Sequence, residues 1–564
     1  MRWRYTSIML GDKILAEPYT LGSNMSKGSL PIPFCIPDYQ RPYEWDAEDG
    51  ECEKLWEDLT EHFDAKAKTD YFLGSIVICK EKSNQYAIID GRQRITTLML
   101  MFRAFYEKCR NNKGFDNLVS QLSAQLWTIK KGIGGGKPIF SQCRLNISDE
   151  NERDDFKKIM SETLNLDNPK SKYQENYLYF WNKIKELNDT KLAFYIEHFL
   201  DNSFLLVVTC DDTEDALNIF NTLNTRGRPL CDSDIFKAKM LQNEKNKQLR
   251  SNIKAFFEKA HRTEKIEIDS IFRYYSHYLR GKEKNTNKEK SLRNFYLDDK
   301  AKNLHKSDIL NHLDKLLNFW NYVQNDLGKP FSVDKKKLDF ASLKWLHCLS
   351  VYPIESWKYA VSTYVLIYGF KNFAKFLNKL TILCYYKALV DPGEKKIKQE
   401  IYRICVELFK SPTFKMSIGS LPTEEHFENA GKSKYAKGLV LIHSYLNEKN
   451  SKSLKLDFEV EHILPVKWKK ANYSYWNEDE AKALIETLGN KIALEKGING
   501  PIQNYDFKFK LNGDNKTNGY KDSLYVEVKK LYKKYSESKK WNPEDVRKRN
   551  DTFQKNIKSF FNGI

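Results

Sequence analysis

Two segments rich in β-branched and aromatic residues, followed at once by a helical pattern, constrain the fold of this chain most strongly. The segments are YFLGSIVIC at 71–79 and QYAIID at 85–90, with a polar turn between them. The apolar residues that follow recur at the spacing of one helical face: Ile95, Leu98, Met99 and Phe102. The sequence therefore predicts two strands that deliver the start of a helix to the edge of a sheet, a common place for a ligand.

The first turn of this predicted helix has an unusual charge. Asp90 followed by Gln93 fits a capping box. Arg92 and Arg94 also lie in this turn, where the helix dipole is already positive and each like charge costs roughly 0.3–1 kcal/mol. One interpretation is a capping box with solvated arginines. The other is a site for an anion that offsets the two cations.

A second group of polar residues lies near the end of the chain. The segment LDFEVEHILP at 456–465 alternates, so that its three carboxylates share one strand face and Phe458 and Val460 share the other. A histidine follows directly, and Pro465 ends the pairing. The segment LGNKIAL at 488–494 predicts the next strand. Neighbouring residues on a strand point to opposite faces, so Glu461 and His462 are expected to converge only at a strand end or bulge.

The order of these residues resembles that of an HNH, or ββα-metal, nuclease. A neutral imidazole accepts a proton from water near pH 7, so His462 is the predicted general base and Asn490 its orienting partner. A hard divalent cation, Mg²⁺ or Mn²⁺, prefers oxygen ligands, which Glu461 and Asn499 supply. Lys508 is predicted to add positive charge at the phosphate.

The motifs taken together resemble one known family. Four N-terminal stretches are similar to the GmrS-type module: IPDYQRPYEW at 36–45, YFLGSIVI, IIDGRQRITTL and FNTLNTRGRPLCDSDIFK at 220–237. The C-terminal segment resembles the GmrD-type HNH module. The fusion is similar to GmrSD-type, modification-dependent (type IV) restriction endonucleases. The resemblance implies a ParB/sulfiredoxin-like core that binds and hydrolyses ATP or GTP.

The resemblance also implies which residues hold the nucleotide. In the family the signature is usually Asp-Gly-Gln-Gln-Arg, and here Arg92 replaces the first glutamine. A triphosphate at this helix start would make the two arginines tolerable, because charge-assisted bonds are about twice as strong as neutral ones. The alternative for the YQRPYEW stretch is an aromatic core wedge, and Asp234 and Lys237 are expected to pack or pair. The predicted nucleotide-binding residues are Gln40, Arg41, Tyr43, Asp90, Gly91, Arg92, Gln93, Arg94, Thr96, Asn224 and Arg226.

Composition agrees with a DNA-directed protein. The formal net charge is +18 with a pI of about 9.1, which favours a polyanionic partner, although a lysine-rich surface alone is the alternative. The ten cysteines stand singly without a CxxC pair, which is typical of small buried hydrophobes in a reducing compartment. No signal peptide and no membrane span are expected, so the predicted location is the cytoplasm.

The sequence thus predicts an α+β multidomain protein with three parts. These are a ParB/sulfiredoxin-like α/β nucleotide-binding and DNA-sensing domain at 1–245, a helical connecting region at 246–415, and an HNH domain at 416–564 within helical surroundings. The charged stretch at 281–290 is expected to be a solvated linker.

The predicted function is an NTP-regulated, divalent-metal-dependent DNA endonuclease of bacterial anti-phage defence that recognises modified DNA. A homo-oligomer or a partner from the same defence system is compatible with this prediction. Two alternatives remain open from the sequence. One is a nucleotide-switched DNA-binding sensor or clamp with an inactive HNH fold, and the other is an RNA-directed nuclease toxin.

Overall fold

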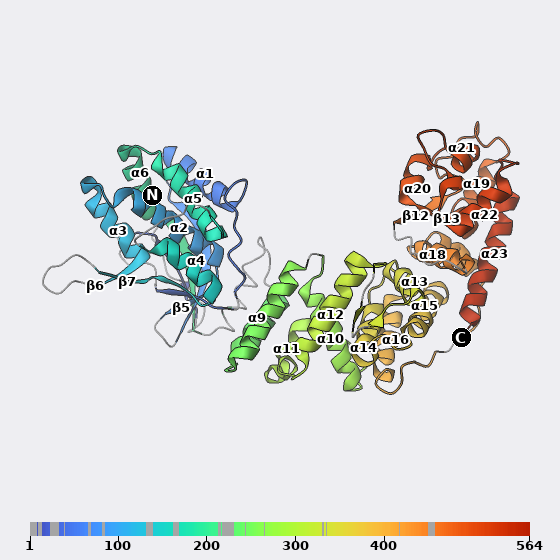
Figure 1. Cartoon of the computed structure of the whole chain (residues 1–564), viewed down its shortest axis with the longest axis horizontal. Coiled ribbons are helices and arrows are strands. Elements are labelled where there is room, and N and C mark those ends of the chain that lie inside the picture. The colour runs from blue at the N-terminus through green and yellow to red at the C-terminus, as the bar shows by residue number, and fades with distance from the viewer. Residues whose placement is uncertain are drawn as a thin grey trace. The chain divides into compact units, whose positions relative to one another are not determined.

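The computed structural model divides the chain into two compact units, residues 1–242 and 243–564 (Figure 1). The predicted boundary at 245 lies close to this division, and the boundary predicted at 415 lies inside the second unit. The structure describes residues 8–9, 14–22, 33–38, 40–65, 69–81, 85–130, 139–161, 169–211, 216, 231–242, 244–263, 265–329, 332–333, 336–416, 418–448 and 457–563.

The first unit is built on a mixed seven-stranded sheet with the strand order β1-β2-β9-β4-β5-β3-β8. Its strands are β1 (Ile8–Met9), β2 (Ile14–Thr20), β3 (Phe34–Ile36), β4 (Tyr71–Lys80), β5 (Tyr86–Asp90), β8 (Leu145–Ile147) and β9 (Ser203–Cys210). β4 lies parallel to β9 and antiparallel to β5, with an irregularity between Val77 and Ile78. The strands predicted at 71–79 and 85–90 are therefore confirmed as neighbours.

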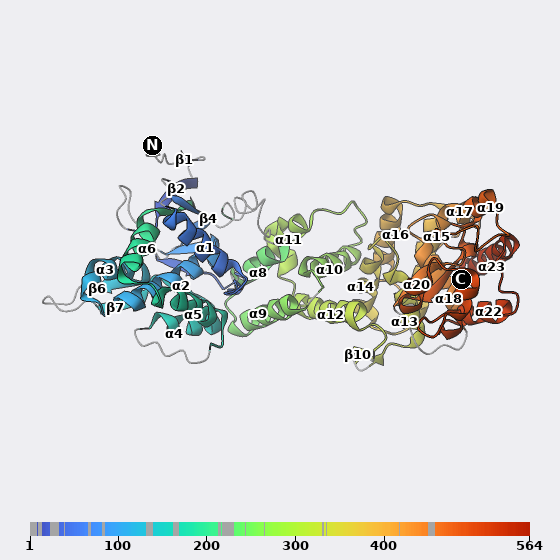
Figure 2. The same cartoon turned by 90° about the horizontal axis from the view of Figure 1, so that it is seen from above.

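Helices cover one face of this sheet, and β6 and β7 form a separate hairpin (Figures 1 and 2). The elements are α1 (Glu51–Asp64), α2 (Arg92–Cys109), α3 (Asp116–Leu126), β6 (Trp127–Lys130), β7 (Ile139–Cys143), α4 (Glu150–Met160), α5 (Lys172–Lys185), α6 (Asp189–Asp201) and α8 (Asp232–Gln242). Ile76, Ile78 and Ile88 belong to the large core beneath α2. Val77 and Ala87, one residue away on each strand, belong to a smaller cluster, as strand alternation requires.

The link between β5 and α2 depends on Gly91. Its φ is +94°, in the left-handed region that favours glycine. A Cβ at this position would lie 2.4 Å from Cγ2 of Ile76, so close packing also excludes a side chain. The first turn of α2 is therefore fixed against the sheet by the absence of a side chain at residue 91.

The variant Gly91→Ala is expected to destabilise the first unit by roughly 2–5 kcal/mol, from backbone strain and overpacking together. Urea unfolding followed by circular dichroism measures the effect. Gly114→Ala is the control, because a Cβ there would meet only the Asn112 side chain at 3.5 Å. Equal unfolding midpoints for the two variants would contradict the packing argument.

The second unit is mainly helical. Its N-terminal part contains α9 (Lys247–Arg262), α10 (Ile268–Lys282), α11 (Leu292–Ala301), α12 (Ile309–Asn321), a π-helical turn (Tyr322–Asp326), β10 (Ser332–Val333), β11 (Lys336–Lys337), α13 (Phe340–Ser350), α14 (Trp357–Tyr368), α15 (Phe373–Val390) and α16 (Glu394–Glu407). None of the helices in the described part of the chain combines the length and apolar character that a membrane span requires.

The stretch 281–290 is largely exposed, as expected for a solvated segment, but it is anchored at Glu289. Glu289 accepts a hydrogen bond from Arg273 at 3.0 Å and lies 3.4 Å from Nε2 of His277. The His277 ring stacks on Tyr359 at a centroid distance of 3.8 Å. These contacts lower the pKa of Glu289 to about 2 against the opposing effect of burial. One half-buried carboxylate therefore holds a charged segment to the helical core.

The C-terminal part of the second unit surrounds a two-stranded antiparallel sheet (Figure 1). Its elements are α17 (Glu424–Gly431), α18 (Ala436–Asn447), β12 (Phe458–His462), α19 (Glu478–Leu484), a 3₁₀ turn (Leu488–Asn490), β13 (Lys491–Glu495), α20 (Lys496–Ile502), α21 (Phe507–Asn512), a second 3₁₀ turn (Tyr520–Asp522), α22 (Val526–Tyr535) and α23 (Pro543–Asn562). The strands predicted around Glu461 and Ile492 are therefore confirmed as partners in one antiparallel pair.

Candidate functional site

The segment 40–45 lies against the end of β5 and the start of α2. The side-chain amide of Gln40 donates to two carbonyl oxygens of β5, at 3.2 and 2.9 Å. The side chain of Gln93 donates to the carbonyl oxygen of Pro42 at 2.8 Å and accepts from the amide of Glu44 at 2.9 Å. The segment 40–45 and the link between β5 and α2, which are far apart in the sequence, thus form one surface.

The predicted capping box is wrong. The N-cap of α2 is Gly91, and it makes no side-chain capping bond. Gln93 bonds instead to the segment 42–44, because that segment presents a free amide and carbonyl beside the helix. The glutamine therefore joins two loops instead of closing its own helix.

Two of the predicted phosphate-binding arginines already have acidic partners. The buried guanidinium of Arg92 lies 2.6 Å from a carboxylate oxygen of Glu152 and donates to the backbone oxygen of Arg41. The guanidinium of Arg41 pairs with Asp234 at 2.8 Å, so of the two expectations for Asp234, packing or pairing, the structure shows pairing. The cost of Arg92 in the first turn of α2 is thus offset by one carboxylate, and the charge of the nearby Arg41 is offset by another.

Arg94 has a different environment. Its guanidinium donates to the carbonyl oxygen of Ser75 at 2.7 Å and makes no ion pair within the described ranges. It lies against Gly74, where a Cβ would be 2.8 Å from Cζ of the arginine. Burial lowers the pKa of Arg94, and Asp90 opposes this shift. Burial likewise raises the pKa of Asp90, while Arg94 lowers it.

Two further predicted nucleotide ligands belong to the protein core. The Tyr43 hydroxyl bonds to Thr97 at 2.6 Å and accepts from Asn176 at 2.9 Å. Thr96 is fully buried, and its hydroxyl has no partner among the residues that the structure describes. The alternative of an aromatic core wedge therefore applies to Tyr43. The predicted ligands Asn224 and Arg226 lie outside the described residues.

In the second unit, β12 and β13 form a regular antiparallel pair that runs from Phe458 opposite Glu495 to His462 opposite Lys491. Glu461 and His462, adjacent at the end of β12, have separate sets of partners. The convergence expected at the strand end is therefore absent from this conformation, because the ladder stays regular up to His462 and strand alternation separates the two side chains.

Glu461 is almost fully buried, at 2% exposure. Its Oε1 atom accepts hydrogen bonds from the Lys510 ammonium at 2.5 Å and the Tyr520 hydroxyl at 2.8 Å. Burial raises the pKa of Glu461, and Lys510 opposes this shift. A buried carboxylate of this kind is stable only with such partners.

His462 lies at the end of β12 with 23% of its side chain exposed. Its Nε2 atom lies 3.5 Å from a carboxylate oxygen of Glu486, whose other oxygen pairs with Lys491 at 2.6 Å. Burial and the positive charge of Lys491 lower the pKa of His462, while Glu486 raises it. The imidazole is thus partly accessible and neutral at pH 7.

Asn490 holds the chain beyond β12 and does not contact the imidazole. Its carbonyl oxygen accepts from the Leu464 amide at 2.8 Å and the Trp541 indole at 3.1 Å. Its NH₂ group donates to the carbonyl oxygens of Leu464 and Ile485 at 2.9 and 3.0 Å. All four hydrogen-bonding positions of the amide are filled. In this conformation Asn490 therefore cannot also orient His462 through a direct bond, contrary to the sequence-based expectation.

Asn499 lies on α20 beside the acidic face of β12. Its NH₂ group donates to Glu459 at 3.0 Å, and its buried carbonyl oxygen has no partner among the described residues. Three His, Cys, Asp or Glu side chains that would hold a metal by themselves are not found together in the described part of the chain. The donor set nevertheless fits Mg²⁺, which takes one or two protein oxygens and completes its shell with water and phosphate. Glu459 joins Glu461 and Asn499 as a candidate oxygen ligand.

Sequence reasoning chose Lys508, but the lysine beside Glu461 is Lys510. Lys508 is exposed on α21. Phe507, Lys510 and Leu511 form the buried face of this helix. Residues 507, 510 and 511 recur at the spacing of one helical face. This spacing could have indicated from the sequence that Lys510 lies on the buried face of the helix.

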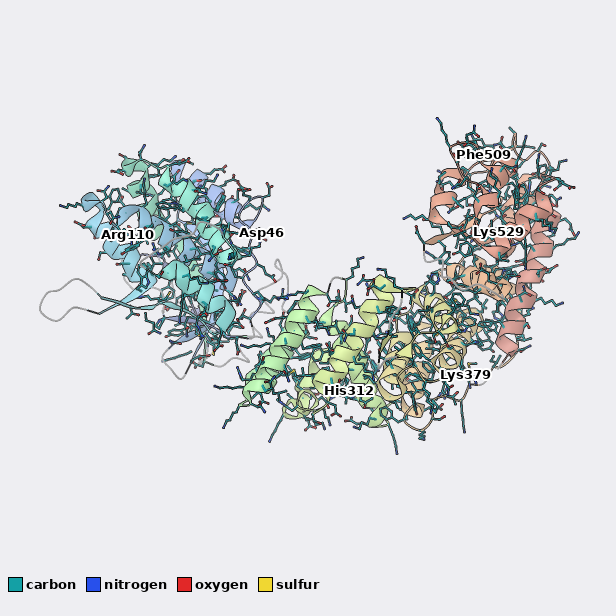
Figure 3. All side chains as sticks on the ribbon, viewed as in Figure 1. Asp46, Arg110, His312, Lys379, Phe509 and Lys529 are labelled. Atoms are coloured by element: carbon teal, nitrogen blue, oxygen red, sulfur yellow. The ribbon has the colours of Figure 1, made fainter. Side chains whose placement is uncertain are left out.

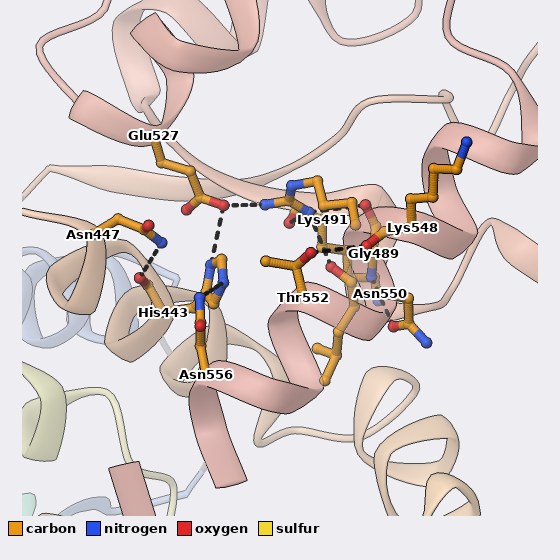
Figure 4. Close-up of polar contacts among 11 residues, drawn as sticks. His443, Asn447, Gly489, Lys491, Glu527, Lys548, Asn550, Thr552 and Asn556 are labelled. Carbon is orange, nitrogen blue, oxygen red and sulfur yellow. Dashed lines mark hydrogen bonds and ion pairs between the residues drawn. The ribbon is translucent and has the colours of Figure 1, made fainter. Parts of the chain in front are cut away.

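Helix α23 stabilises the turn that carries Asn490. One nitrogen of the Arg549 guanidinium donates to the carbonyl oxygens of Leu488, Gly489 and Lys491, between 2.8 and 3.2 Å. The other nitrogen pairs with Glu527 at 2.5 Å, and Nδ1 of His443 lies 3.0 Å from the same carboxylate (Figure 4). This network fixes the start of β13 relative to α18, α22 and α23.

The network predicts a stability that depends on pH. Arg549 and His443 hold the pKa of Glu527 at about 2, below its ordinary 4.5, against the effect of burial. The resulting stabilisation, about 3 kcal/mol, is complete above pH 4.5 and is lost as the pH falls toward 2. Thermal unfolding of Glu527→Gln should therefore show a deficit at pH 7 that shrinks over this interval.

Glu537→Gln is the control for this measurement, since Glu537 is exposed near the end of α22. The control should unfold like the unmodified protein at every pH. A deficit in Glu527→Gln that stays constant from pH 7 to pH 2 would contradict the assigned pKa.

Comparison with known protein families gives two matches. Residues 20–241 match the N-terminal domain of the GmrSD restriction endonucleases, and residues 422–556 match the C-terminal domain of the same enzymes. The first match contains the mixed sheet from β3 onward and its helices, and the second contains β12, β13 and the helices around them. A comparison with curated proteins finds no match.

The two matched regions cover more than half of the chain and occur in the order N-terminal domain, C-terminal domain. A chain of this kind unites the two parts of a restriction endonuclease. The protein belongs to the GmrSD restriction endonuclease family. Helices α9–α16 lie between the two matched regions.

Proposed function

We propose that this protein is an NTP-regulated, divalent-metal-dependent DNA endonuclease of anti-phage defence that recognises modified DNA and cuts it with its C-terminal HNH site. The observation that carries the proposal is the presence of both GmrSD domains on one chain. The net charge of +18 supports a polyanionic substrate.

In the proposed reaction a water molecule attacks the phosphorus atom of a phosphodiester. The His462 imidazole accepts the proton of this water, a new P–O bond forms, and the bond to the leaving sugar oxygen breaks. The partial exposure of His462 supports this role, because a substrate phosphate needs access to the ring. The Glu486 carboxylate, with an oxygen 3.5 Å from Nε2, is a contact that positions the ring.

Glu461, Asn499 and Glu459 are the candidate ligands of the metal. A hard divalent cation there supplies electrostatic stabilisation of the charge that develops on the phosphate and the leaving oxygen. The unpartnered oxygen of Asn499 supports this assignment, since a buried carbonyl oxygen without a partner is costly.

The N-terminal unit is the proposed nucleotide-binding part. Arg94 is the strongest candidate for contact with phosphate, because Arg41 and Arg92 are paired with Asp234 and Glu152. Gln40 and Gln93 stabilise the loop beside it. ATP and GTP are both compatible with these contacts.

Arg94→Ala is expected to weaken ATP or GTP binding by about 10- to 100-fold, the value of one or two charge-assisted hydrogen bonds. Isothermal titration calorimetry on the full chain measures the affinity. Arg110→Ala is the matched control, because Arg110 is exposed at the other end of α2 (Figure 3). Unchanged affinity in Arg94→Ala would refute the assignment of phosphate binding to Arg94.

One observation favours a second candidate function, a nucleotide-switched DNA sensor with an inactive nuclease fold. The Lys510 ammonium occupies Oε1 of Glu461, the predicted metal ligand. A nicking assay on supercoiled plasmid with Mg²⁺ separates the two functions, since a sensor binds DNA without cutting it. RNA and DNA substrates tested side by side separate a DNA endonuclease from an RNA-directed toxin.

A further inference from the structure

A cavity of about 420 Å³ lies inside the second unit, next to the candidate nuclease strand. It is bordered by the C-terminal end of α12 and the π-helical turn, by the end of α13, by the start of α14 and by β12. Its aromatic lining residues are Trp320, Tyr352, Trp357 and Phe458. Its volume is in the range of sites that hold small organic ligands.

The aromatic walls of this cavity are held in fixed positions. Trp320 and Trp357 contact each other at a centroid distance of 5.5 Å and an angle of 64°. The indole N–H of Trp320 donates to the Ser362 hydroxyl at 2.9 Å. Tyr352 packs edge-on against Tyr385 at 5.2 Å. Rigid aromatic walls of this kind favour a flat aromatic ligand, because stacking then costs little reorganisation.

Positive charge lies at the same cavity. The exposed Lys437 ammonium lies 5.0 Å from the Phe458 ring centroid and forms no ion pair with any described residue. The Lys358 ammonium lies 5.9 Å from the Trp320 ring, and its carboxylate partner Glu355 is 70% exposed. Glu355 also lines the cavity, so a ligand phosphate would compete with this exposed carboxylate for Lys358.

A buried histidine provides a polar group within the lining. His347 is 3% exposed, and its Nδ1 atom bonds to the Tyr445 hydroxyl at 2.7 Å. Its Nε2 atom has no hydrogen-bond partner in the described part of the chain. The ring meets Phe458 edge-on at 5.6 Å. The second ring nitrogen of this cavity-lining histidine can donate a hydrogen bond to, or accept one from, a ligand in the cavity.

The backbone beside the cavity gives a second, independent indication of a ligand-binding site. Residues Tyr322–Asp326 form a π-helical turn at the end of α12, and Val323 and Gln324 from this turn line the cavity. π-helical turns are rare and frequently lie at functional sites, because the regular α-helical hydrogen bonds are given up locally. Here the irregular turn forms one wall of the cavity.

We propose that this cavity binds a nucleotide, with its base between the aromatic side chains, an edge of the base at His347 and its phosphate at Lys437 and Lys358. Phe458 is the first residue of β12, and His462 follows four residues later, about 13 Å along the strand. This separation corresponds to about four base steps of DNA. A free nucleotide and a nucleotide turned out of a DNA duplex close to the cleavage site both present a base and a phosphate to the cavity. Only the second source rests on the proposed nuclease function.

The test uses the fluorescent base analogue 2-aminopurine, whose emission falls when it stacks on an aromatic ring. The first arm titrates the full chain, carrying Arg94→Ala to weaken the N-terminal site, into 2-aminopurine deoxynucleoside monophosphate. The second arm titrates the full chain, carrying His462→Ala to prevent cleavage, into a duplex with one 2-aminopurine. Each arm compares Lys437→Glu and Gln324→Trp with the control Lys375→Glu. All three positions are exposed, so the variants should fold, and melting temperatures check this.

We expect Lys437→Glu, which reverses the charge, and Gln324→Trp, which fills the cavity, to weaken binding at least tenfold. Lys375→Glu should leave it unchanged. Weakening in the first arm identifies a free nucleotide as the ligand, and weakening in the second arm alone identifies a base from DNA. Equal affinity of all three variants in both arms would overturn the proposal. Because neither arm requires cleavage, loss of the cavity proposal and loss of the nuclease proposal are distinguishable.

Discussion

His462→Ala is expected to lower DNA cleavage by about 10²- to 10⁴-fold, because the variant lacks the only predicted proton acceptor at the scissile phosphate. Nucleotide turnover should be unchanged, since the candidate nucleotide site belongs to the first unit. The folded state should remain intact, because the imidazole is partly exposed and its one polar contact among the described residues is a long one, with Glu486 at 3.5 Å. Cleavage of supercoiled plasmid and hydrolysis of ATP or GTP are measured on the same preparation.

The control is His305→Ala, an exposed histidine of the same unit. It should cut and hydrolyse like the unmodified protein. Cleavage by His462→Ala at the unmodified rate would reject His462 as the general base. A parallel loss of cleavage and nucleotide turnover would instead indicate a global effect on the chain.

Asn490→Ala is expected to destabilise the second unit by roughly 3–5 kcal/mol. The substitution removes four hydrogen bonds and leaves the amide and carbonyl of Leu464, the carbonyl of Ile485 and the indole of Trp541 without their partner. Each buried group left unpaired costs about 1–3 kcal/mol, and part of this is recovered by relaxation. Urea unfolding followed by tryptophan fluorescence measures the change.

Asn472→Ala is the matched control, because Asn472 is exposed in the same unit. The measurement also separates two roles for Asn490. A destabilised Asn490→Ala whose remaining folded fraction still cuts DNA supports a structural role. An unchanged unfolding midpoint together with lost cleavage would instead restore the role of orienting the imidazole.

Local patterns predicted the elements that carry both candidate sites. The strands β4 and β5 were predictable because β-branched residues cluster in short runs between polar turns. The strand around Glu461 was predictable because its side chains alternate and Pro465 ends the pairing. The glycine between β5 and α2 was also recognisable, since an Asp-Gly pair is typical of a turn.

The partners of the charged side chains were not predictable, because they come from distant parts of the chain. Arg92 pairs with Glu152, and Lys510 pairs with Glu461. No periodicity within one segment links either pair, and only the packed fold brings them together. For the same reason the sequence placed Asn490 next to His462, whereas its amide is saturated by backbone groups that follow β12.

The Lys510–Glu461 contact has a consequence for the proposed reaction. A metal at Glu461 competes with the Lys510 ammonium for the same carboxylate oxygen. The Lys510 side chain is fully buried and also donates to the carbonyl oxygen of His462, so a metal at Glu461 would have to displace a buried ammonium.

The most direct test of the central claim, that this chain cuts DNA with a metal at β12, is an assay on matched modified and unmodified phage DNA. The full chain is incubated with each DNA, with Mg²⁺ or EDTA, and with ATP, GTP or no nucleotide. The account predicts nicks or breaks in modified DNA that require Mg²⁺ and a nucleoside triphosphate and are lost in His462→Ala. Cleavage that persists in EDTA, or intact DNA under every condition while the protein still binds it, would contradict the account.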